Sequence, residues 1–205
     1  MKVSREQMAI NRERLLDIAS RLFRERGFDG VSVAEVMQEA GLTHGGFYGH
    51  FASKEALAAE AATHALMQTA NRWKATLENR GMEGLEPLLN AYLSQRHIDH
   101  PGAGCAIAAL GPELSRQSEP VRAAFAAELE NLIDALASFL PGADAAGRRT
   151  RALALMAQMV GAIVLARAFG RSVLAAEILE AVRAAMKAPG GVLTPTQPES
   201  RHAHS

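Results

Sequence analysis

Apolar side chains recur every three or four residues along most of the chain, and short groups of glycine, proline, serine and aspartate interrupt them. This spacing places the apolar side chains on one face of a helix, whereas a half-buried strand would show strict alternation. The sequence contains no stretch of such alternation and no internal repeat. The pattern therefore predicts an all-α fold.

The most densely punctuated stretch is residues 32–57, SVAEVMQEAGLTHGGFYGHFASKEAL. Ser32 is a suitable N-cap for a first helix, and Gly41 is a suitable residue to end it. Thr43 is predicted to cap a second helix of barely two turns, and Ser53 is predicted to cap a third. Two helices joined by a glycine turn are typical of a helix-turn-helix that reads DNA.

The second of these helices has one apolar face. Phe47 and Phe51 lie four residues apart, which places both rings on the face that packs against the neighbouring helices. Each of the glycines Gly45, Gly46 and Gly49 costs about 1 kcal/mol relative to alanine, so this short helix needs its neighbours to hold it. Two interpretations of the glycines stay open: they permit close helix packing, or they let the exposed backbone approach DNA.

The opposite face carries groups that suit DNA. Thr43 can donate to a phosphate or a base edge, His44 can donate to guanine N7 and O6, and Tyr48 offers a ring with a hydroxyl. Lys54 lies in the first turn of the third helix, where the helix dipole disfavours a cation but a nearby phosphate would favour it. The alternatives are a core histidine bonded to a carbonyl for His50 and an ordinary solvated lysine for Lys54.

Residues 11–60 resemble the DNA-binding domain of the tetracycline-repressor (TetR) family, through an arginine-rich first helix ending in RERGFDGVSV and the following VAEVMQEAGLTHGGFYGHFASKEAL. The resemblance implies a three-helix helix-turn-helix domain, assigned to residues 8–60, and a helical ligand-binding and dimerisation domain, assigned to residues 61–188. It implies a homodimer that binds double-stranded DNA. We expect no cofactor and no bound metal.

The candidate DNA-binding residues are Ser32, Thr43, His44, Gly45, Gly46, Tyr48, His50 and Lys54. By resemblance, the residues that face the major groove are Thr43, His44, Gly45, Gly46 and Tyr48, and those that reach phosphates are Tyr48, His50 and Lys54. The chain departs from the usual family pattern at Gly46 and Gly49, where a larger side chain is common. We therefore expect specificity to depend mainly on His44, Tyr48 and the shape of the DNA.

The charge balance limits how the chain can bind a polyanion. It has 22 Lys and Arg residues and 22 Asp and Glu residues, so the formal net charge is zero. Up to Lys54 there are eight basic and seven acidic residues, a difference of one. Any affinity for DNA must therefore be local, and a dimer is needed to double the contacts.

Further helices are predicted after residue 52, over residues 53–79, 87–99, 105–111, 118–140, 145–169 and 172–187. Turn formers fill residues 189–205, which predicts a disordered tail. A single cysteine cannot form an internal disulfide, and the polar start has no signal-peptide pattern. No apolar run approaches eighteen residues, so we expect a cytoplasmic protein without a membrane segment.

The last two predicted helices are apolar on more than one face. On the first of them these residues are Leu153, Met156, Ala157, Val160, Gly161, Val164, Leu165 and Ala168. One interpretation places all of them in the core of one protomer. The other is a dimer interface, which two-fold recognition of DNA requires and which the family resemblance places on these helices.

A regulator needs a site for an inducer, here an unknown small molecule. The candidate ligand-binding residues are Trp73, Tyr92, Arg96, Cys105, Phe125 and Met159, although each is also a plausible core or surface residue. The segment GCAIAALGPELSRQSEPVR resembles a TetR subgroup with a Gly-Cys pair before this short helix, which includes repressors that sense reactive electrophiles. Cys105 is therefore a candidate sensor, activated by a helix N-terminus and by His97 or His100. The alternatives are a small buried hydrophobe, or a metal site with both histidines.

Three classes of function remain at this stage. The first is a ligand-responsive transcriptional regulator, most simply a repressor. The second is an enzyme that uses the cluster His97, His100, Cys105 and Glu113, but no phosphate-binding glycine loop or nucleophile motif accompanies it. The third is a helical interaction module without DNA binding, which the zero net charge permits.

Overall fold

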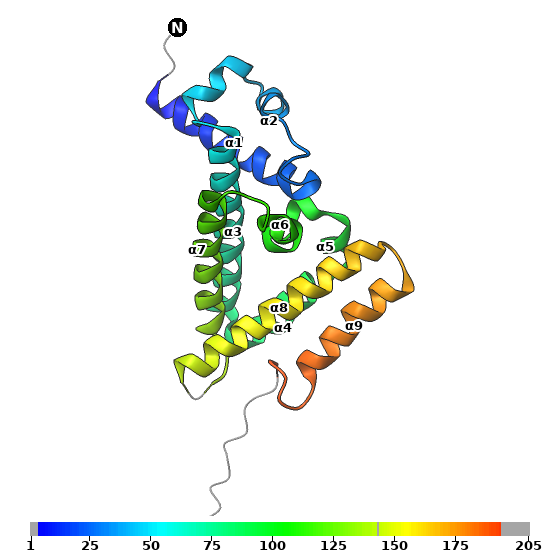
Figure 1. Ribbon diagram of the computed structural model, residues 1–205. Coiled ribbons are helices and arrows are strands. Elements are labelled where there is room, and N and C mark those ends of the chain that lie inside the picture. The colour runs from blue at the N-terminus through cyan, green and yellow to red at the C-terminus, as the bar shows by residue number, and fades with distance from the viewer. Residues whose placement is uncertain (1–3, 143, 194–205) are drawn as a thin grey trace, which may run out of the picture.

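The computed structural model describes residues 4–142 and 144–193, and every regular element in these ranges is a helix (Figure 1). The α-helices are α1 (Arg5–Arg26), α2 (Val33–Glu39), α3 (Lys54–Arg80), α4 (Leu85–Tyr92), α5 (Gln95–Asp99), α6 (Ala106–Leu114), α7 (Glu119–Ala137), α8 (Ala145–Phe169) and α9 (Val173–Lys187). The 3-10 helices are η1 (His44–Gly49), η2 (Gly81–Gly84) and η3 (Pro101–Ala103). The predicted all-α fold is confirmed.

The long helix α3 joins the two ends of the molecule (Figure 1). It packs against α1 and, side by side, against α7, while α8 and α9 form an antiparallel pair. Short helix α6 lies between α1 and α8 and contacts both. The buried side chains form one continuous core, and α3 crosses the predicted domain boundary at residues 60 and 61. The division into two domains stays a prediction.

Serine caps explain several of the helix starts. The side chains of Ser32, Ser53 and Ser172 each accept a hydrogen bond from the backbone three residues later. The predicted side-chain cap at Thr43 is wrong, because its hydroxyl makes no capping bond. The same correction applies at Ser118, where α7 begins instead with proline in its first turn.

Two predicted boundaries in the middle of the chain are also wrong. The single helix expected over residues 87–99 is broken into α4 and α5, because Leu93 leaves the helical conformation and Ser94 caps α5 through the His97 amide. Helix α6 continues beyond Gly111 to Leu114. Pro112 removes only its own N–H donor, and α6 ends two residues later, so little helical bonding is lost.

Helix α8 is, within the described ranges, the one helix long and apolar enough by composition to cross a membrane. A core helix of a globular protein passes the same test, and α8 packs against α5, α6, α7 and α9. The predicted tail falls largely on residues 194–205, which lie outside the described residues.

Candidate nucleic-acid interface and ligand cavity

Helix α2, the first helix of the predicted helix-turn-helix, is held at both ends. A reciprocal capping box joins Ser32 and Glu35: the Ser32 Oγ accepts from the Glu35 amide at 3.2 Å, and the Ser32 amide donates to the Glu35 carboxylate at 2.8 Å. These bonds to Ser32 lower the pKa of Glu35. At the other end, Gly41 adopts φ +67°, a left-handed conformation that favours glycine. The start of α2 is therefore fixed by the capping box, and the turn after it is allowed by the left-handed conformation of Gly41.

The second helix is a 3-10 helix, not an α-helix. Its backbone hydrogen bonds span three residues: the Gly46 amide donates to the Thr43 carbonyl at 2.9 Å, and the His50 amide donates to the Phe47 carbonyl at 2.8 Å. Phe47 and Phe51 are 1% and 3% exposed, and their ring centroids lie 5.8 Å apart. Burying two such rings contributes about 3 to 6 kcal/mol, enough to offset the roughly 3 kcal/mol cost of three glycines.

The glycines are not needed for packing within the chain. A Cβ at Gly45 would meet nothing within 4 Å. At Gly46 it would lie 3.6 Å from the Met37 side chain, and at Gly49 it would lie 3.8 Å from the Met8 side chain. These are ordinary van der Waals distances, so the close-packing interpretation is wrong for these residues. The other interpretation, that the glycines let the exposed backbone approach DNA, stays a prediction.

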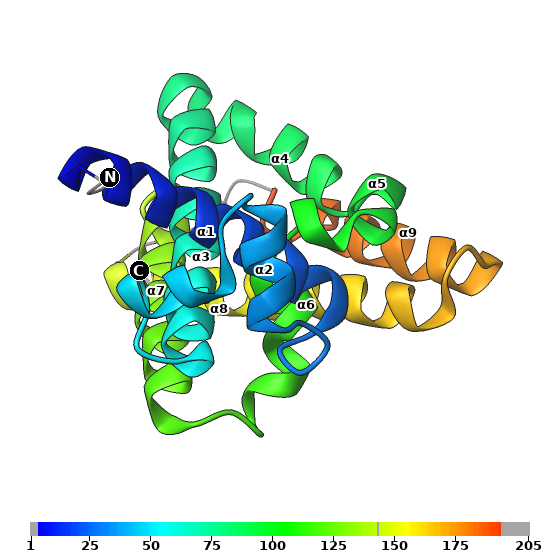
Figure 2. The same ribbon diagram turned by 90° about the horizontal axis from the view of Figure 1, so that it is seen from above.

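The side chains predicted to face DNA lie on the outside of the molecule. Figure 2 views the molecule from above, with α1, α2 and the start of α3 toward the reader. Tyr48 is 72% exposed although its ring packs edge-on against Phe47 at 5.3 Å. The other exposed candidates on this surface are Ser32, Thr43, His44, Gly45 and Gly46.

His50 and Lys54 are half-buried beside this surface. The His50 ring makes no hydrogen bond in the described part of the chain, so the alternative of a core histidine bonded to a carbonyl is wrong. Burial lowers the pKa of His50, and the positive charge of Arg12 adds to the effect. Arg12 itself lies 4.7 Å above the Phe51 ring and pairs with Glu60 of α3, so it holds the segment between η1 and α3 in place.

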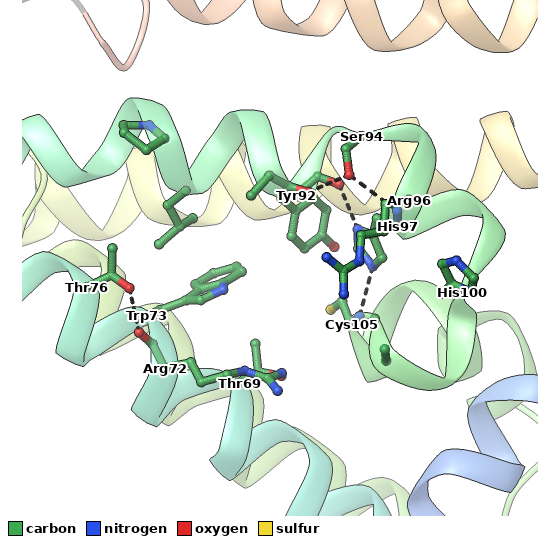
Figure 3. A pocket seen from close by; sticks show the side chains of 15 residues that line it. Thr69, Arg72, Trp73, Thr76, Tyr92, Ser94, Arg96, His97, His100 and Cys105 are labelled. Atoms are coloured by element: carbon green, nitrogen blue, oxygen red, sulfur yellow. Dashed lines mark hydrogen bonds between the residues drawn. The ribbon is translucent and has the colours of Figure 1, made fainter.

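A cavity of about 460 Å³ opens between α3, α4, α5 and the segment that precedes α6 (Figure 3). Four predicted ligand-binding residues line it, namely Trp73, Tyr92, Arg96 and Cys105. The placement of Phe125 and Met159 is corrected: neither lines this cavity, and they are only 1% and 0% exposed within the core. Phe125 lies on the buried face of α7, and Met159 lies on the buried face of α8.

Cys105 is 3% exposed and precedes the first residue of α6. Its amide donates to His97 Nε2 at 2.9 Å, and His97 Nδ1 lies 2.7 Å from the Tyr92 carbonyl oxygen, to which it donates. This pattern requires a neutral imidazole, and burial lowers the pKa of His97 to about 4. The expectation that His97 activates the thiol by its charge is therefore wrong, because the ring is uncharged at neutral pH.

The structure does not support a metal site at these residues. Both His97 nitrogens already have backbone partners, and His100 is exposed. Among residues 4–142 and 144–193, no group of three His, Cys, Asp or Glu side chains is placed to hold a metal ion.

Two contacts connect the cavity to the end of α1. The Arg24 guanidinium donates to the Gly102 carbonyl, with Nε at 2.9 Å, just before α6. The Phe28 amide donates to the Glu113 carboxylate at 2.9 Å, near the last residue of α6. Helix α6 therefore starts directly after Cys105, beside the cavity, and ends against the loop that leads into α2. This role of Arg24 could not be predicted from the sequence, because its partner is 78 residues away.

The last two helices leave part of their apolar surface uncovered. Leu153, Leu165 and Phe169 of α8 are 44%, 51% and 52% exposed, and Val173 and Leu174 of α9 are 76% and 45% exposed. Other predicted residues of this surface divide: Met156 is buried, whereas Ala157 and Ala168 are exposed. The interpretation that places all of them in the core of one protomer is wrong, because one stripe of α8 is buried and another is exposed. The dimer interface stays a prediction.

Comparisons with known proteins agree with this arrangement. The model of the bacterial regulatory proteins of the tetR family matches residues 15–61. The uncharacterized HTH-type transcriptional regulator MT0206 of Mycobacterium tuberculosis is 30% identical over 167 residues, which cover 76% of this chain and 84% of that protein. The HTH-type transcriptional repressor DhaR of Mycobacterium sp. is 31% identical over 111 residues, 54% of this chain and only 56% of DhaR.

Solved structures show the same fold over most of the chain. The crystal structure of reduced E. coli NemR has a TM-score of 0.72 and 25% identity, and the match covers 85% of this chain and 94% of NemR. A TetR-family regulator from Agrobacterium tumefaciens has a TM-score of 0.69 and 23% identity. The matched family consists of transcriptional regulators, not enzymes. The chain belongs to the tetR family of bacterial regulatory proteins.

Proposed function

We propose that this protein is a cytoplasmic transcriptional regulator that binds a palindromic DNA operator as a homodimer, represses transcription and is released by a small molecule. The observation that carries the proposal is the second helix of the helix-turn-helix. Its aromatic side is buried through Phe47, and its other side presents exposed Tyr48 beside glycines with open space around them.

Each exposed group has a role that its chemistry supports. His44 and Thr43 contact base edges or phosphates at the start of η1, and the Tyr48 ring and hydroxyl contact the sugar-phosphate backbone. Gly45 and Gly46 let the backbone approach the groove without side-chain bulk. Ser32 is exposed, but its hydroxyl bonds to Glu35, so its role is to hold the start of α2 at the DNA surface.

The flanking residues suit phosphate contact. His50 and Lys54 are half-buried, and neither side chain forms a hydrogen bond or an ion pair in the described ranges. Lys54 begins α3, where a phosphate would offset the unfavourable effect of the helix dipole on its charge.

The uncovered apolar surface of α8 and α9 is the proposed dimer interface. Large exposed apolar patches mark association sites in soluble proteins, and Leu165, Phe169 and Val173 are all more than half exposed. Two-fold symmetry would pair this surface with itself and place two recognition helices about 34 Å apart, one turn of DNA.

Ligand response is proposed from the cavity and its connections. A molecule in the cavity contacts the residues that precede α6, while Glu113 at the far end holds the Phe28 amide. Displacement of α6 would change how α1 sits on the rest of the protein, and so the spacing of the two recognition helices. Cys105 offers a covalent variant: its sulfur adds to the β-carbon of an unsaturated carbonyl compound, and the thiol proton ends on the α-carbon.

The test of DNA binding is a Tyr48→Ala variant. Genomic fragments retained by the wild-type protein define the operator, and fluorescence anisotropy then measures affinity. We expect Tyr48→Ala to weaken operator binding at least about tenfold while helicity and oligomeric state stay unchanged, because the ring lies outside the core. Tyr48→Phe separates ring from hydroxyl, and Met82→Ala, exposed on η2, is the control. Unchanged affinity of Tyr48→Ala would refute the assignment.

A further inference from the structure

The lining of the cavity is cationic and contains no acid. Arg72 reaches it from α3 and Arg96 from α5, and the two side chains lie on facing walls in Figure 3. No aspartate or glutamate is among the lining residues. In the described part of the chain neither arginine has a carboxylate partner, and the hydrogen bond of Arg72 goes to the Thr69 hydroxyl at 3.3 Å.

Two further guanidinium groups lie behind this lining and also lack a carboxylate within the described ranges. Arg24 donates to the Gly102 carbonyl, and Arg167 donates to the His97 carbonyl at 2.7 Å. Arg167 keeps Nε and Nη1 buried without a partner. Burial, followed by repulsion from Arg72, lowers the pKa of Arg24 to about 10. Within the described ranges no carboxylate therefore forms an ion pair with these guanidinium groups, although Glu25 lies near enough to Arg24 to oppose the lowering of its pKa.

The buried end of the cavity offers one more polar group. Tyr92 is 7% exposed, and its hydroxyl has no nitrogen or oxygen partner among the described residues, but the Cys105 thiol, a weak hydrogen-bonding group, lies beside it. Burial, with a smaller contribution from Cys105, raises the pKa of Tyr92 well above its ordinary value, so the hydroxyl is neutral. A neutral hydroxyl with only a thiol beside it can still donate to an acceptor on a ligand in the cavity.

The remaining wall is aromatic and apolar. The Trp73 and Tyr92 rings meet edge-on with centroids 5.8 Å apart, and Leu88 lies beside them in the lining. A flat apolar wall next to arginines selects a molecule with an aromatic body and a negatively charged group. A cation would meet like charges, whereas an anion can pair with Arg72 and Arg96, which are both exposed and solvated when no ligand is present.

We propose that this cavity binds an aromatic carboxylate, with its rings against Trp73 and Tyr92 and its carboxylate toward Arg72 and Arg96. The Tyr92 hydroxyl donates to the ligand. The proposal rests on the proposed ligand response, whose inducer it assigns to a chemical class.

The test uses biphenyl-4-carboxylate and its neutral analogue biphenyl-4-carboxamide as probes of the full-length protein. Isothermal titration calorimetry measures affinity, and fluorescence of Trp73, the one tryptophan of the chain, reports occupancy of the cavity. We expect the carboxylate to bind at least about tenfold more tightly than the carboxamide. Arg72→Gln and Arg96→Gln should each remove about tenfold of carboxylate affinity and leave carboxamide affinity unchanged.

The control is Arg80→Gln, which replaces an exposed arginine, the last residue of α3, that does not line the cavity; this change should alter neither affinity. Equal affinities for the two probes, binding of neither, or insensitivity to both cavity substitutions would overturn the proposal. Operator binding, measured in parallel, separates this result from the proposed function. Charge-selective binding without release of DNA would leave the anion site standing and refute ligand-controlled release.

Discussion

The buried imidazole of His97 makes the stability of the protein depend on pH. The ring is neutral, with Nδ1 donating to the Tyr92 carbonyl and Nε2 accepting from the Cys105 amide. Burial lowers its pKa from 6.5 to about 4, against the opposing effect of the hydrogen bond to Tyr92 and with help from the charge of Arg167. At about 1.4 kcal/mol for each factor of ten in a proton-binding constant, the difference corresponds to roughly 3 kcal/mol.

The sign follows from the direction of the shift. Between pH 6.5 and about 4, the unfolded chain binds a proton at His97 more readily than the folded protein does. The stabilisation from the neutral ring is therefore complete above pH 6.5 and is lost as the pH falls toward 4. His97 alone should lower the free energy of unfolding by up to about 1.4 kcal/mol per pH unit in this window.

The assay is urea unfolding at a fixed protein concentration, between about pH 4.5 and 7, because oligomerisation would otherwise change the apparent stability. We expect His97→Gln to be less stable at pH 7 but to lose less stability on acidification than the wild type. His100→Gln is the matched control, since His100 is exposed and three residues away. If wild type and His97→Gln lost stability in parallel, the neutral, buried assignment of this ring would be wrong.

Three other substitutions test separate parts of the molecule. Gly45→Ala should raise the free energy of unfolding by up to about 1 kcal/mol in urea denaturation, since the added methyl group meets open space. It should also weaken operator binding in the anisotropy assay. A lower free energy of unfolding would contradict this prediction. Leu165→Glu should convert the dimer to a folded monomer in analytical ultracentrifugation, whereas the control Met82→Glu should leave the dimer intact. A dimer that persists in Leu165→Glu would show that this surface is not the dimer interface. Glu113→Gln should cost about 1 to 2 kcal/mol and reduce the effect of ligand on operator affinity; an unchanged ligand effect would rule out coupling through α6.

Local signals in the sequence predicted much of the fold. The helix starts at Ser32, Ser53 and Ser172 are specified by a side chain and an amide three residues apart, so sequence alone contains both partners. The buried pair Phe47 and Phe51 was predictable for the same reason, as was the exposure of the opposite face. The break at Ser94 was present as a cap signal too, but the apolar spacing on either side obscured it.

The cavity depends on partners that are far apart in the chain. Arg167 bonds to the His97 carbonyl 70 residues away, and Arg24 bonds to Gly102 78 residues away. Spacing along the sequence contains no information about such pairs, so Arg24, Arg72 and Arg167 were not predicted to surround one site. Phe125 was wrongly predicted as lining because an aromatic residue on an amphipathic helix suits a core as well as a cavity.

The arginines of α1 show why charge counting along the sequence is a poor guide to DNA binding here. Arg21 pairs with Glu25 and Glu39, Arg26 pairs with Glu35, and Arg24 is committed to the Gly102 carbonyl. The basic character at the end of this helix therefore holds the protein together and connects it to the segment before α6. The groups proposed to contact DNA are therefore Thr43, the exposed residues of η1, His50, and Lys54 at the start of α3. A single protomer then has few phosphate contacts, so the second protomer is needed for affinity, and any change in the spacing of the pair acts directly on binding.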